Sequence, residues 1–415
     1  MSLACGVDFG TSNSTIGFHR PGQPALLPLE DGRPTLPSVV FFNADDNKVL
    51  FGRAALSDYL AGYEGRLMRS LKSLLGTALI DSQTEVEGRA LPFRELLSLF
   101  VRELKRRGEA AAGESFTQAV VGRPVHFIDD NDAADRLAQD TLEEIVRAAG
   151  FRDVLFQYEP IAAAFDYESR ISGEELVLIA DIGGGTSDFS LVRLGPERAK
   201  KAERRDDILA SAGVHIGGTD FDKYLSLAAA MPLLGLGSRL NNGLDVPSSY
   251  YFNLATWHTI NFVYTQKVWR ELQDLVRDAC ERDKLALLLK LIAQRDGHWL
   301  AMQVEQGKIA LSAQDAVTLP LDRLGPDLPL PLQRADFDNA ISHLVDSIES
   351  TVRGMLAQTG VAAAAVDTVF FTGGSSGVPL LRQRIAALLP SARRVEGDPF
   401  GSIGTGLALD AARRF

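Results

Sequence analysis

The feature that most constrains this chain is a short pattern that occurs twice: an apolar run ends in an aspartate, and glycine and hydroxyl residues follow. The stretch 179–190 is IADIGGGTSDFS, and the stretch 5–18 is CGVDFGTSNSTIGF. Either copy alone is compatible with a simple hairpin, because glycine supplies the positive φ of tight turns. Two related copies in one chain predict an internal duplication. The matched segments are Asp8-Phe9-Gly10 with Asp181-Ile182-Gly183, and Thr11-Ser12-Asn13 with Thr186-Ser187-Asp188, with two extra residues in the second copy.

The residue types in this pattern favour binding of a phosphate together with a cation. A glycine-rich turn exposes successive backbone N–H groups, which cradle phosphate oxygens. An aspartate beside a polyphosphate repels it unless a cation lies between them, and Mg²⁺ suits that place because it keeps several waters. We therefore expect Asp8, Asp181 and Asp188 to face a magnesium–phosphate group through water, while glycines 183–185 let the backbone approach the phosphate. No GxxxxGK[ST] sequence occurs, so the pattern is not a Walker A loop.

Length and composition limit the partners and the compartment. A chain of 415 residues predicts about two to four lobes, and the formal net charge of −11 argues against a nucleic-acid groove. The apolar stretch 285–293 is broken by Lys290, and the N-terminus lacks the basic and apolar regions of a secretory signal. Two cysteines, Cys5 and Cys280, indicate a reducing compartment, and six scattered histidines give no zinc-ligand spacing. We expect a cytoplasmic protein that binds neither membrane nor nucleic acid.

A third glycine turn and the alternation of strands with helices indicate an α/β protein. Residues 369–379, VFFTGGSSGVP, again place an apolar strand before paired glycines. Loops at strand ends are where α/β folds bind ligands. Residues 133–149 have helical spacing, with residues 129–131 available as N-caps and Gly150 at the end. The short apolar runs VLFQYEP and ELVLIAD predict buried strands, so strands and helices alternate along the chain.

Six segments match, in order, the motifs of one family. They are GVDFGTSNS at 6–14 for GIDLGTTNS, VVGRPVHF at 120–127 for VVTVPAYF, EPIAAA at 159–164 for EPTAAA, DIGGGTSD at 181–188 for DLGGGTFD, GGTDFD at 217–222 for GGEDFD, and GGSSGVP at 373–379 for GGSTRIP. The chain thus resembles the nucleotide-binding (ATPase) domain of DnaK-type heat-shock chaperones, in the actin-like ATPase superfamily. The resemblance implies an α/β, duplicated actin-like ATPase (ribonuclease H-like) fold with two lobes around a nucleotide cleft.

The resemblance also implies a domain layout. Lobe I comprises residues 1–178, with the C-terminal helix 399–415 returning to it, and lobe II comprises 179–398. Within lobe II, residues 222–312 form a mostly helical upper subdomain that is longer than in typical family members. Its added sequence is rich in aromatic residues over 250–269, which either pack a local core or form a partner surface.

The resemblance implies catalytic roles for four residues. Lys72, in LKSLLG, stands where the family has the lysine that orients the attacking water and the terminal phosphate, although lysines are usually solvated surface residues. Glu159 would contact a magnesium-bound water, or it could instead cap the helix that begins at Pro160. Asp181 and Thr186 would position water and charge in line with the γ-phosphate.

The cofactors implied are ATP or ADP with Mg²⁺, and the nucleotide contacts carry over residue by residue. Contacts are expected from Gly10, Thr11, Ser12, Asn13, Gly183, Gly184, Gly185, Gly217, Gly218, Glu305, Lys308, Ser312, Gly373, Gly374 and Ser375. Two departures affect the base: the family's adenine-stacking arginines are replaced by Ile309 and Gly377. A third departure lies in DPFGSIGTGLA at 398–408, where the family's acidic pair becomes Phe400 and Gly401, while the small residues still suit tight helix packing.

Several functions remain open. The sequence ends at Phe415, so we expect a short family member that lacks the peptide-binding domain and relies on co-chaperones or a separate substrate-binding protein. The first hypothesis is a monomeric, slow, chaperone-type ATPase in which turnover drives lobe opening and closing. A nucleotide-gated binding module with negligible hydrolysis is the second, and an actin-fold kinase or filament protein is the third.

Overall fold

The computed structural model describes residues 3–86, 88–128, 131–325 and 328–415, which form two compact units. The larger unit comprises Met1–Val214, Thr351–Ser376 and Ile385–Phe415, and the smaller unit comprises His215–Ser350 and Gly377–Arg384. The expected lobe boundaries at 178/179 and 398/399 stay a prediction.

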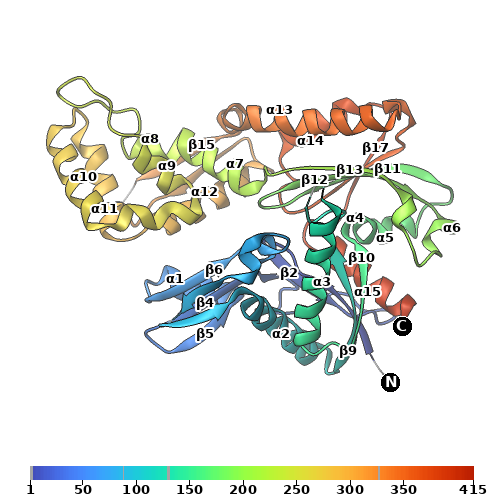
Figure 1. The fold of residues 1–415 in the computed structure, drawn as a ribbon. Helices are drawn as coiled ribbons and strands as arrows, with labels where there is room; N and C mark the ends of the chain where they lie inside the picture. The colour runs from blue at the N-terminus through green and yellow to red at the C-terminus, as the bar shows by residue number, and fades with distance from the viewer. Residues whose placement is uncertain (1–2, 87, 129–130, 326–327) are drawn as a thin grey trace. The chain divides into compact units, whose positions relative to one another are not determined.

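The larger unit contains two five-stranded mixed sheets with the same strand order (Figure 1). The first runs β10-β9-β1-β2-β3, and the second runs β13-β12-β11-β16-β17. In each sheet an antiparallel hairpin is extended by one antiparallel strand on one side and by two parallel strands on the other. This repetition confirms the internal duplication and the α/β class. The strands are β1 (Leu3–Asp8), β2 (Asn13–Gly17), β3 (Leu36–Pro37), β9 (Phe116–Arg123), β10 (Asp153–Tyr158), β11 (Glu175–Ile182), β12 (Ser187–Leu194), β13 (Ile208–Val214), β16 (Thr368–Thr372) and β17 (Arg393–Glu396).

The registers of the two hairpins correct the expected alignment of the copies. Asp8 lies opposite Thr15 in the first hairpin, and Asp181 lies opposite Asp188 in the second. The same number of positions separates the partners in both hairpins, so the second copy has no extra residues. Asp188 therefore takes the place of Thr15 rather than that of Asn13. The similar side chains of the two turns suggested the other alignment of the copies. The register of a hairpin is set instead by its buried face and its turn geometry.

Two long helices, α2 (Phe93–Ala112) and α3 (Asp132–Ala148), cover one face of the first sheet (Figure 1). Cys5 and Val7 are alternate residues of β1 and share one hydrophobic cluster with both helices. Side chains alternate between the faces of a strand, so the neighbours of these two residues face the opposite side of the sheet.

Helix α3 matches the helix expected over 133–149. Asn131 is its N-cap, with Oδ1 accepting a hydrogen bond from Ala134 N at 3.1 Å. The other two proposed caps, Asp129 and Asp130, lie outside the described residues. The helix ends before Gly150, whose φ of +103° suits a residue without a side chain.

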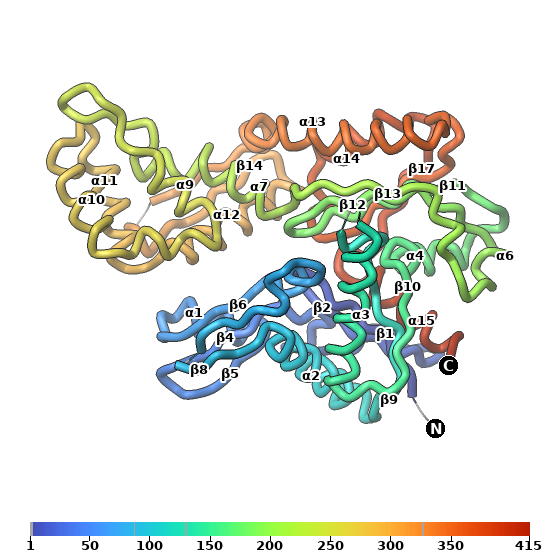
Figure 2. The backbone as a smooth tube through the Cα atoms, in the orientation of Figure 1, coloured from blue at the N-terminus to red at the C-terminus, as the bar shows by residue number. Residues whose placement is uncertain are grey.

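The C-terminal helix α15 (Ser402–Arg414) packs closely on the other face of the first sheet, beside β1 (Figure 2). A Cβ on Gly6 would lie 2.3 Å from Ala408 N. A Cβ on Gly406 would lie 1.9 Å from the carbonyl O of Ala162 in α4 (Glu159–Ala163). These distances leave no room for a side chain, so the small residues of this helix allow its close approach to the sheet.

Helix α4 packs against elements of both five-stranded sheets. It follows β10 directly and packs against α15. Its Ile161 joins a second hydrophobic cluster with Val177 and Ile179 of β11 and with Phe165 of α5 (Phe165–Glu168). The N-terminus of α4, which carries Glu159, is therefore fixed by the packing of both sheets.

Shorter elements complete the larger unit. A three-stranded sheet, β5-β4-β6, leads into the 3₁₀ turn η1. These elements are β4 (Val39–Asn43), β5 (Lys48–Phe51), α1 (Gly52–Leu60), β6 (Gly65–Arg69), η1 (Leu71–Leu74), η2 (Ala78–Asp81), β7 (Gln83–Val86), β8 (Arg89–Pro92), α6 (Pro196–Ala199), η3 (Arg205–Asp207) and η6 (Ala363–Ala365).

The smaller unit is mainly helical, with one two-stranded sheet. Its elements are α7 (Gly218–Leu225), the π-helical η4 (Ser226–Ala230), α8 (Met231–Leu233), α9 (Ser249–Ala255), η5 (Trp257–Tyr264), α10 (Gln266–Asp278), α11 (Arg282–Ala293), α12 (Gly297–Leu311), β14 (Ala316–Pro320) and β15 (Pro329–Gln333). Helices α13 (Arg334–Thr359) and α14 (Pro379–Leu388) each have residues in both units. Across the described part of the chain, no helix is both long and apolar enough to cross a membrane.

Two of the aromatic residues of 250–269 are buried in the local core of this unit. Tyr251 is buried, and the Tyr250 hydroxyl donates to Glu271 at 2.8 Å. Phe252 and Phe262 are exposed instead. The local-core alternative therefore accounts for the two tyrosines, and the partner surface stays a hypothesis that concerns the two phenylalanines.

Candidate functional site

Four carboxylates and one lysine of the larger unit lie at the ends of its strands and helices. Asp8 is the last residue of β1, Asp181 is the penultimate residue of β11, and Asp188 is the second residue of β12. Glu159 begins α4, and Lys72 lies in η1. Strand ends are where an α/β sheet presents functional side chains.

Lys72 and Glu159 form an ion pair. Lys72 Nζ lies 2.5 Å from Glu159 Oε1, and only 11% of the lysine side chain is exposed. Lys72 is therefore not an ordinary solvated lysine. Tyr158 occupies the N-cap position of α4, and no side chain makes a capping hydrogen bond there. Helix capping therefore does not account for Glu159.

Burial and repulsion between acids raise the pKa of two carboxyl groups. Burial, with a contribution from Glu159, raises the pKa of Asp8 to about 7 despite the attraction of Lys72. Burial also raises the pKa of Asp181 to about 8, and Asp188, Glu159 and Asp8 add to this rise. Burial alone would lower the pKa of Lys72, but the surrounding carboxylates outweigh it and raise that pKa. One lysine does not balance the negative charges of these four carboxylates. The group therefore lacks positive charge, and this charge deficit would be filled by a bound cation.

The three glycine turns meet beside these acids. Ser12 Oγ lies 2.3 Å from the position that a Cβ on Gly184 would occupy, so the first and second turns touch. Asp181 Oδ1 lies 2.4 Å from the position of a Cβ on Gly373, so the third turn touches the same acid. Gly373 also has a φ of +84°, which disfavours any residue with a side chain.

The first turn is held by Ser38. Its hydroxyl donates to Gly10 O at 2.7 Å, and its backbone N donates to Ser12 O at 2.9 Å. Gly10 is required because a Cβ there would lie 2.1 Å from Asn13 O. Between these points Thr11 is only partly buried, which leaves its hydroxyl able to meet a ligand.

The second turn has space that the protein itself does not fill. Gly183 N donates to Thr186 O at 2.8 Å, and Thr186 Oγ1 donates to Asp188 Oδ2 at 2.8 Å. A Cβ on Gly185 would meet no atom within 4 Å, and a Cβ on Gly183 would come no closer than 3.4 Å to any atom. Neither glycine has a positive φ. The fold therefore does not need glycine at these two positions, whereas a ligand lying on the backbone would.

The third turn is joined to the second by its backbone. Ser375 is buried and donates from its N to Ile182 O at 2.9 Å. The Phe400 ring lies against Gly374, with Cε1 2.6 Å from the position that a Cβ there would occupy. Phe400 thus stands against the turn where the family sequence has an acid.

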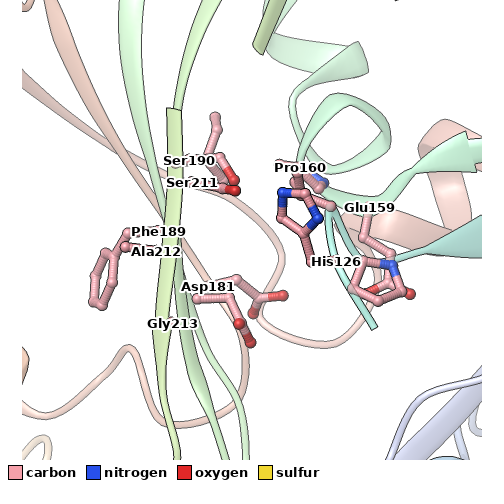
Figure 3. Close-up of a pocket in the computed structure, with 13 residues that line it drawn as sticks. His126, Glu159, Pro160, Asp181, Phe189, Ser190, Ser211, Ala212 and Gly213 are labelled. Carbon is pink, nitrogen blue, oxygen red and sulfur yellow. The ribbon is translucent and has the colours of Figure 1, made fainter. Parts of the chain in front are cut away.

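A cavity of about 50 Å³ lies beside the carboxylates (Figure 3). This volume is enough to hold water. The His126 ring lies between Glu159 and the strands that carry Ser190 and Ser211 (Figure 3). None of these three residues was predicted as part of the site from the sequence. The segment VVGRPVHF held a usable signal for one of them, because His126 stands where the family has tyrosine.

The remaining predicted contacts belong to the smaller unit and gather around α7 and α12. Lys308 is buried, and its Nζ donates to Gly218 O at 3.1 Å and to Asp222 Oδ2 at 2.9 Å. Gly217 precedes α7, and its N donates to Asp220 Oδ2 at 3.0 Å. Lys308 therefore already links the two helices within the protein.

One face of α12 carries the other predicted nucleoside contacts. Glu305 and Ile309 are exposed one helical turn apart. Ser312 follows the helix, and its Oγ lies 3.8 Å from the position that a Cβ on Gly377 would occupy. Replacement of both stacking arginines leaves an aliphatic side chain at 309 and no side chain at 377.

Comparison with known families agrees with this geometry. A family model described as Hsp70 protein matches residues 4–230 and 292–412. The chain belongs to the Hsp70 family. The two repeated sheets are consistent with the duplicated actin-like ATPase fold of Hsp70 proteins, and membership supports a chaperone-type ATP-binding domain with ATPase activity in general. Residues 231–291 fall outside the match, and they include helices α8 to α10, all but the last two residues of α11, and the aromatic-rich segment.

The residues fit the Mg²⁺ that nucleotide binding in Hsp70 proteins typically involves. Within the described ranges, no three His, Cys, Asp or Glu side chains form a cluster that could hold a metal directly. Mg²⁺ commonly binds to proteins through one or two carboxylates, with water and phosphate as its other ligands. The charge deficit around Asp8 and Asp181, beside a turn with unfilled space, suits such an ion.

Proposed function

We propose that this chain binds Mg²⁺-ATP at the three glycine turns and hydrolyses it slowly, and that turnover drives opening and closing of two lobes. The observation that carries the proposal is the largely buried Lys72–Glu159 pair among acids with raised pKa values. It lies next to the 183–185 backbone, where a Cβ on Gly183 or Gly185 would meet no protein atom closely but would obstruct a ligand. Phosphoryl transfer needs positioning and charge stabilisation more than covalent chemistry, and these residues supply both.

Each group has a distinct proposed role. The N–H groups and hydroxyls of residues 10–13 and 183–186 bind the phosphates. Asp8, Asp181 and Asp188 hold the waters of Mg²⁺, which neutralises phosphate charge when bound. Lys72 orients the attacking water and the terminal phosphate, and Glu159 fixes the direction of its ammonium group.

Thr186 and the nucleoside contacts complete the proposed site. The Thr186 hydroxyl, oriented by Asp188, helps to place the water in line with the γ-phosphate. Glu305, Lys308 and Ser312 contact the ribose and base, with Gly217 and Gly218 nearby in the same unit. The turn at 373–375 supplies the remaining nucleoside contacts.

The Lys72→Ala variant tests the proposed chemistry. Phosphate release from Mg²⁺-ATP should fall to background, while the affinity for Mg²⁺-ADP, measured by calorimetry, should change by less than about threefold, because the lysine acts on the terminal phosphate. Lys267→Ala, at a lysine that is 85% exposed, is the control and should turn over ATP like the wild type. Unchanged turnover in Lys72→Ala would refute the role of Lys72.

The proposed partners follow from the family. Hsp70 proteins typically work with co-chaperones and substrate proteins, so we propose that the chain acts as a monomer with such partners in the cytoplasm. A co-chaperone or a separate substrate-binding protein should raise the rate of phosphate release. A rate that no candidate partner changes would favour the alternative of an autonomous nucleotide-gated module.

A further inference from the structure

Phe400 is an exposed aromatic side chain held in a fixed place. It lies between β17 and α15, and 54% of the residue is exposed. Its backbone N donates to Asp398 Oδ1 at 3.0 Å. Ser402 Oγ donates to Asp398 O at 2.8 Å, which closes the same turn. Leaving a phenylalanine in water forfeits the free energy of its burial, but single exposed rings are common on protein surfaces, so its position relative to the candidate site decides whether it has a function.

The ring is connected by contacts to the carboxylates of the candidate site. Phe400 Cε1 and Cζ lie 2.6 Å and 3.0 Å from the position that a Cβ on Gly374 would occupy. The neighbouring Gly373 touches Asp181 through its carboxylate oxygen. Phe400 thus packs against Gly374, the residue that directly follows the one in contact with Asp181. All of these residues belong to the larger unit.

We propose that the exposed face of Phe400 stacks on the base of the bound nucleotide. The inference rests on the proposed function, because it takes the phosphates to lie at Asp181 and the nucleoside to extend along the 373–375 turn. Gly374 has no side chain, so a base can reach the ring across that turn. The chain has Ile309 and Gly377 at the positions of the family's two adenine-stacking arginines, so a stacking contact from Phe400 does not duplicate one that these residues make.

The chemistry of the ring determines which nucleotides it accepts. Stacking on an aromatic side chain tolerates every base, because each base has a π face. An aspartate at this position could accept hydrogen bonds from a base, but it could not stack. The Phe400 contact therefore contributes affinity for nucleotides in general and little discrimination between adenine and guanine.

A comparison of two ligands distinguishes the contribution of the base to affinity from that of the phosphates. Mg²⁺-ADP and Mg²⁺-tripolyphosphate should be titrated into the wild type and the Phe400→Ala variant by calorimetry. The ADP affinity of the variant should fall about 5- to 150-fold, which is the range for loss of one stacked base. The tripolyphosphate affinity should stay within twofold of the wild type. Phe252→Ala, at an exposed phenylalanine of the smaller unit, should match the wild type for both ligands.

A tryptophan at the same position adds a direct optical signal. Phe400→Trp should keep the ADP affinity, and its added fluorescence should be quenched by ADP but not by tripolyphosphate, relative to the wild type with its three tryptophans. Equal ADP affinity of Phe400→Ala and the wild type would overturn the inference and leave the proposed function intact. An equal loss for both ligands would also overturn it, because that result means a structural effect. A wild type that binds neither ligand would overturn both proposals.

Discussion

Replacing Asp181 with asparagine should make the nucleotide-free protein more stable than the wild type at pH 8. Burial, with repulsion from neighbouring acids, raises the pKa of Asp181 from about 3.8 to about 8. The folded protein therefore keeps a proton that the unfolded chain has lost, and its free energy of unfolding falls as the pH rises between these values. Each pH unit in this window amounts to about 1.36 kcal/mol, so the carboxyl costs about 5 kcal/mol at pH 8.

Unfolding by urea at pH 8 and pH 5, with EDTA present, measures this effect. Asparagine has nearly the shape of aspartate and does not ionise, so the variant should gain up to about 5 kcal/mol at pH 8 and only about 1–2 kcal/mol at pH 5. The control is Asp207→Asn, at a buried acid that pairs with Arg204 and Arg198. That variant should be less stable than the wild type at both pH values, because it weakens the compensation of buried guanidinium charge.

Mg²⁺-ADP gives the experiment a second part. A bound cation neutralises the negative charge of Asp181, as the bound proton does in the empty site. Mg²⁺-ADP should therefore stabilise the wild type at pH 8 more than it stabilises Asp181→Asn. If Asp181→Asn and the wild type had equal stability at pH 8 without ligand, the charge deficit would not exist and the case for a cation at these acids would lose its main support.

Three further predictions follow from individual residues. Gly185→Ala should leave the melting temperature unchanged, because the added Cβ meets no protein atom. Calorimetry should show roughly 10- to 100-fold weaker ATP binding, because the Cβ would displace the phosphate from charged hydrogen bonds with the backbone. Normal ATP affinity would mean that no phosphate lies against Gly185. Gly406→Ala should lower the melting temperature, because its Cβ would lie 1.9 Å from Ala162 O; a wild-type melting temperature would contradict the close packing of α15. Because Ile309 and Gly377 replace two adenine-stacking arginines, ADP should bind about one to three decades more weakly to this chain than to DnaK-type relatives that keep both arginines. An aromatic contact with the base would reduce this loss, and the preference for ATP over GTP should be only modest. Nanomolar ADP binding with strong rejection of GTP would refute this expectation.

The sequence predicted the fold where a local pattern determines it. The repeated Asp–Gly turns indicated a duplication, and the two sheets have the same strand order. The pairing of Asp188 with Asp181 was not predictable from the turn residues, because register depends on the buried face and on turn geometry. The resulting error was the two-residue insertion that the hairpins do not contain.

The candidate site was predicted unevenly. Asp8 and Asp181 were recognisable because each ends an apolar strand. Lys72 and Glu159 lie 87 positions apart and meet only through the tertiary fold, so their own sequence environment carries no sign of the pair. His126 was missed because a single histidine in a loop has no periodic or spacing signal, and its one usable signal was its place opposite the family's tyrosine in VVGRPVHF. Its place beside the carboxylates depends on where β9 ends relative to α4.

A single-turnover measurement tests the central claim most directly. The protein should be mixed in excess over Mg²⁺-ATP labelled on its γ-phosphate, and labelled phosphate should be followed over time for the wild type and Lys72→Ala. We expect slow, complete and Mg²⁺-dependent conversion of bound ATP to ADP and phosphate by the wild type, with bound ATP left intact by Lys72→Ala. Bound ATP that remains intact in the wild type would contradict the account and identify the chain as a nucleotide-gated binding module.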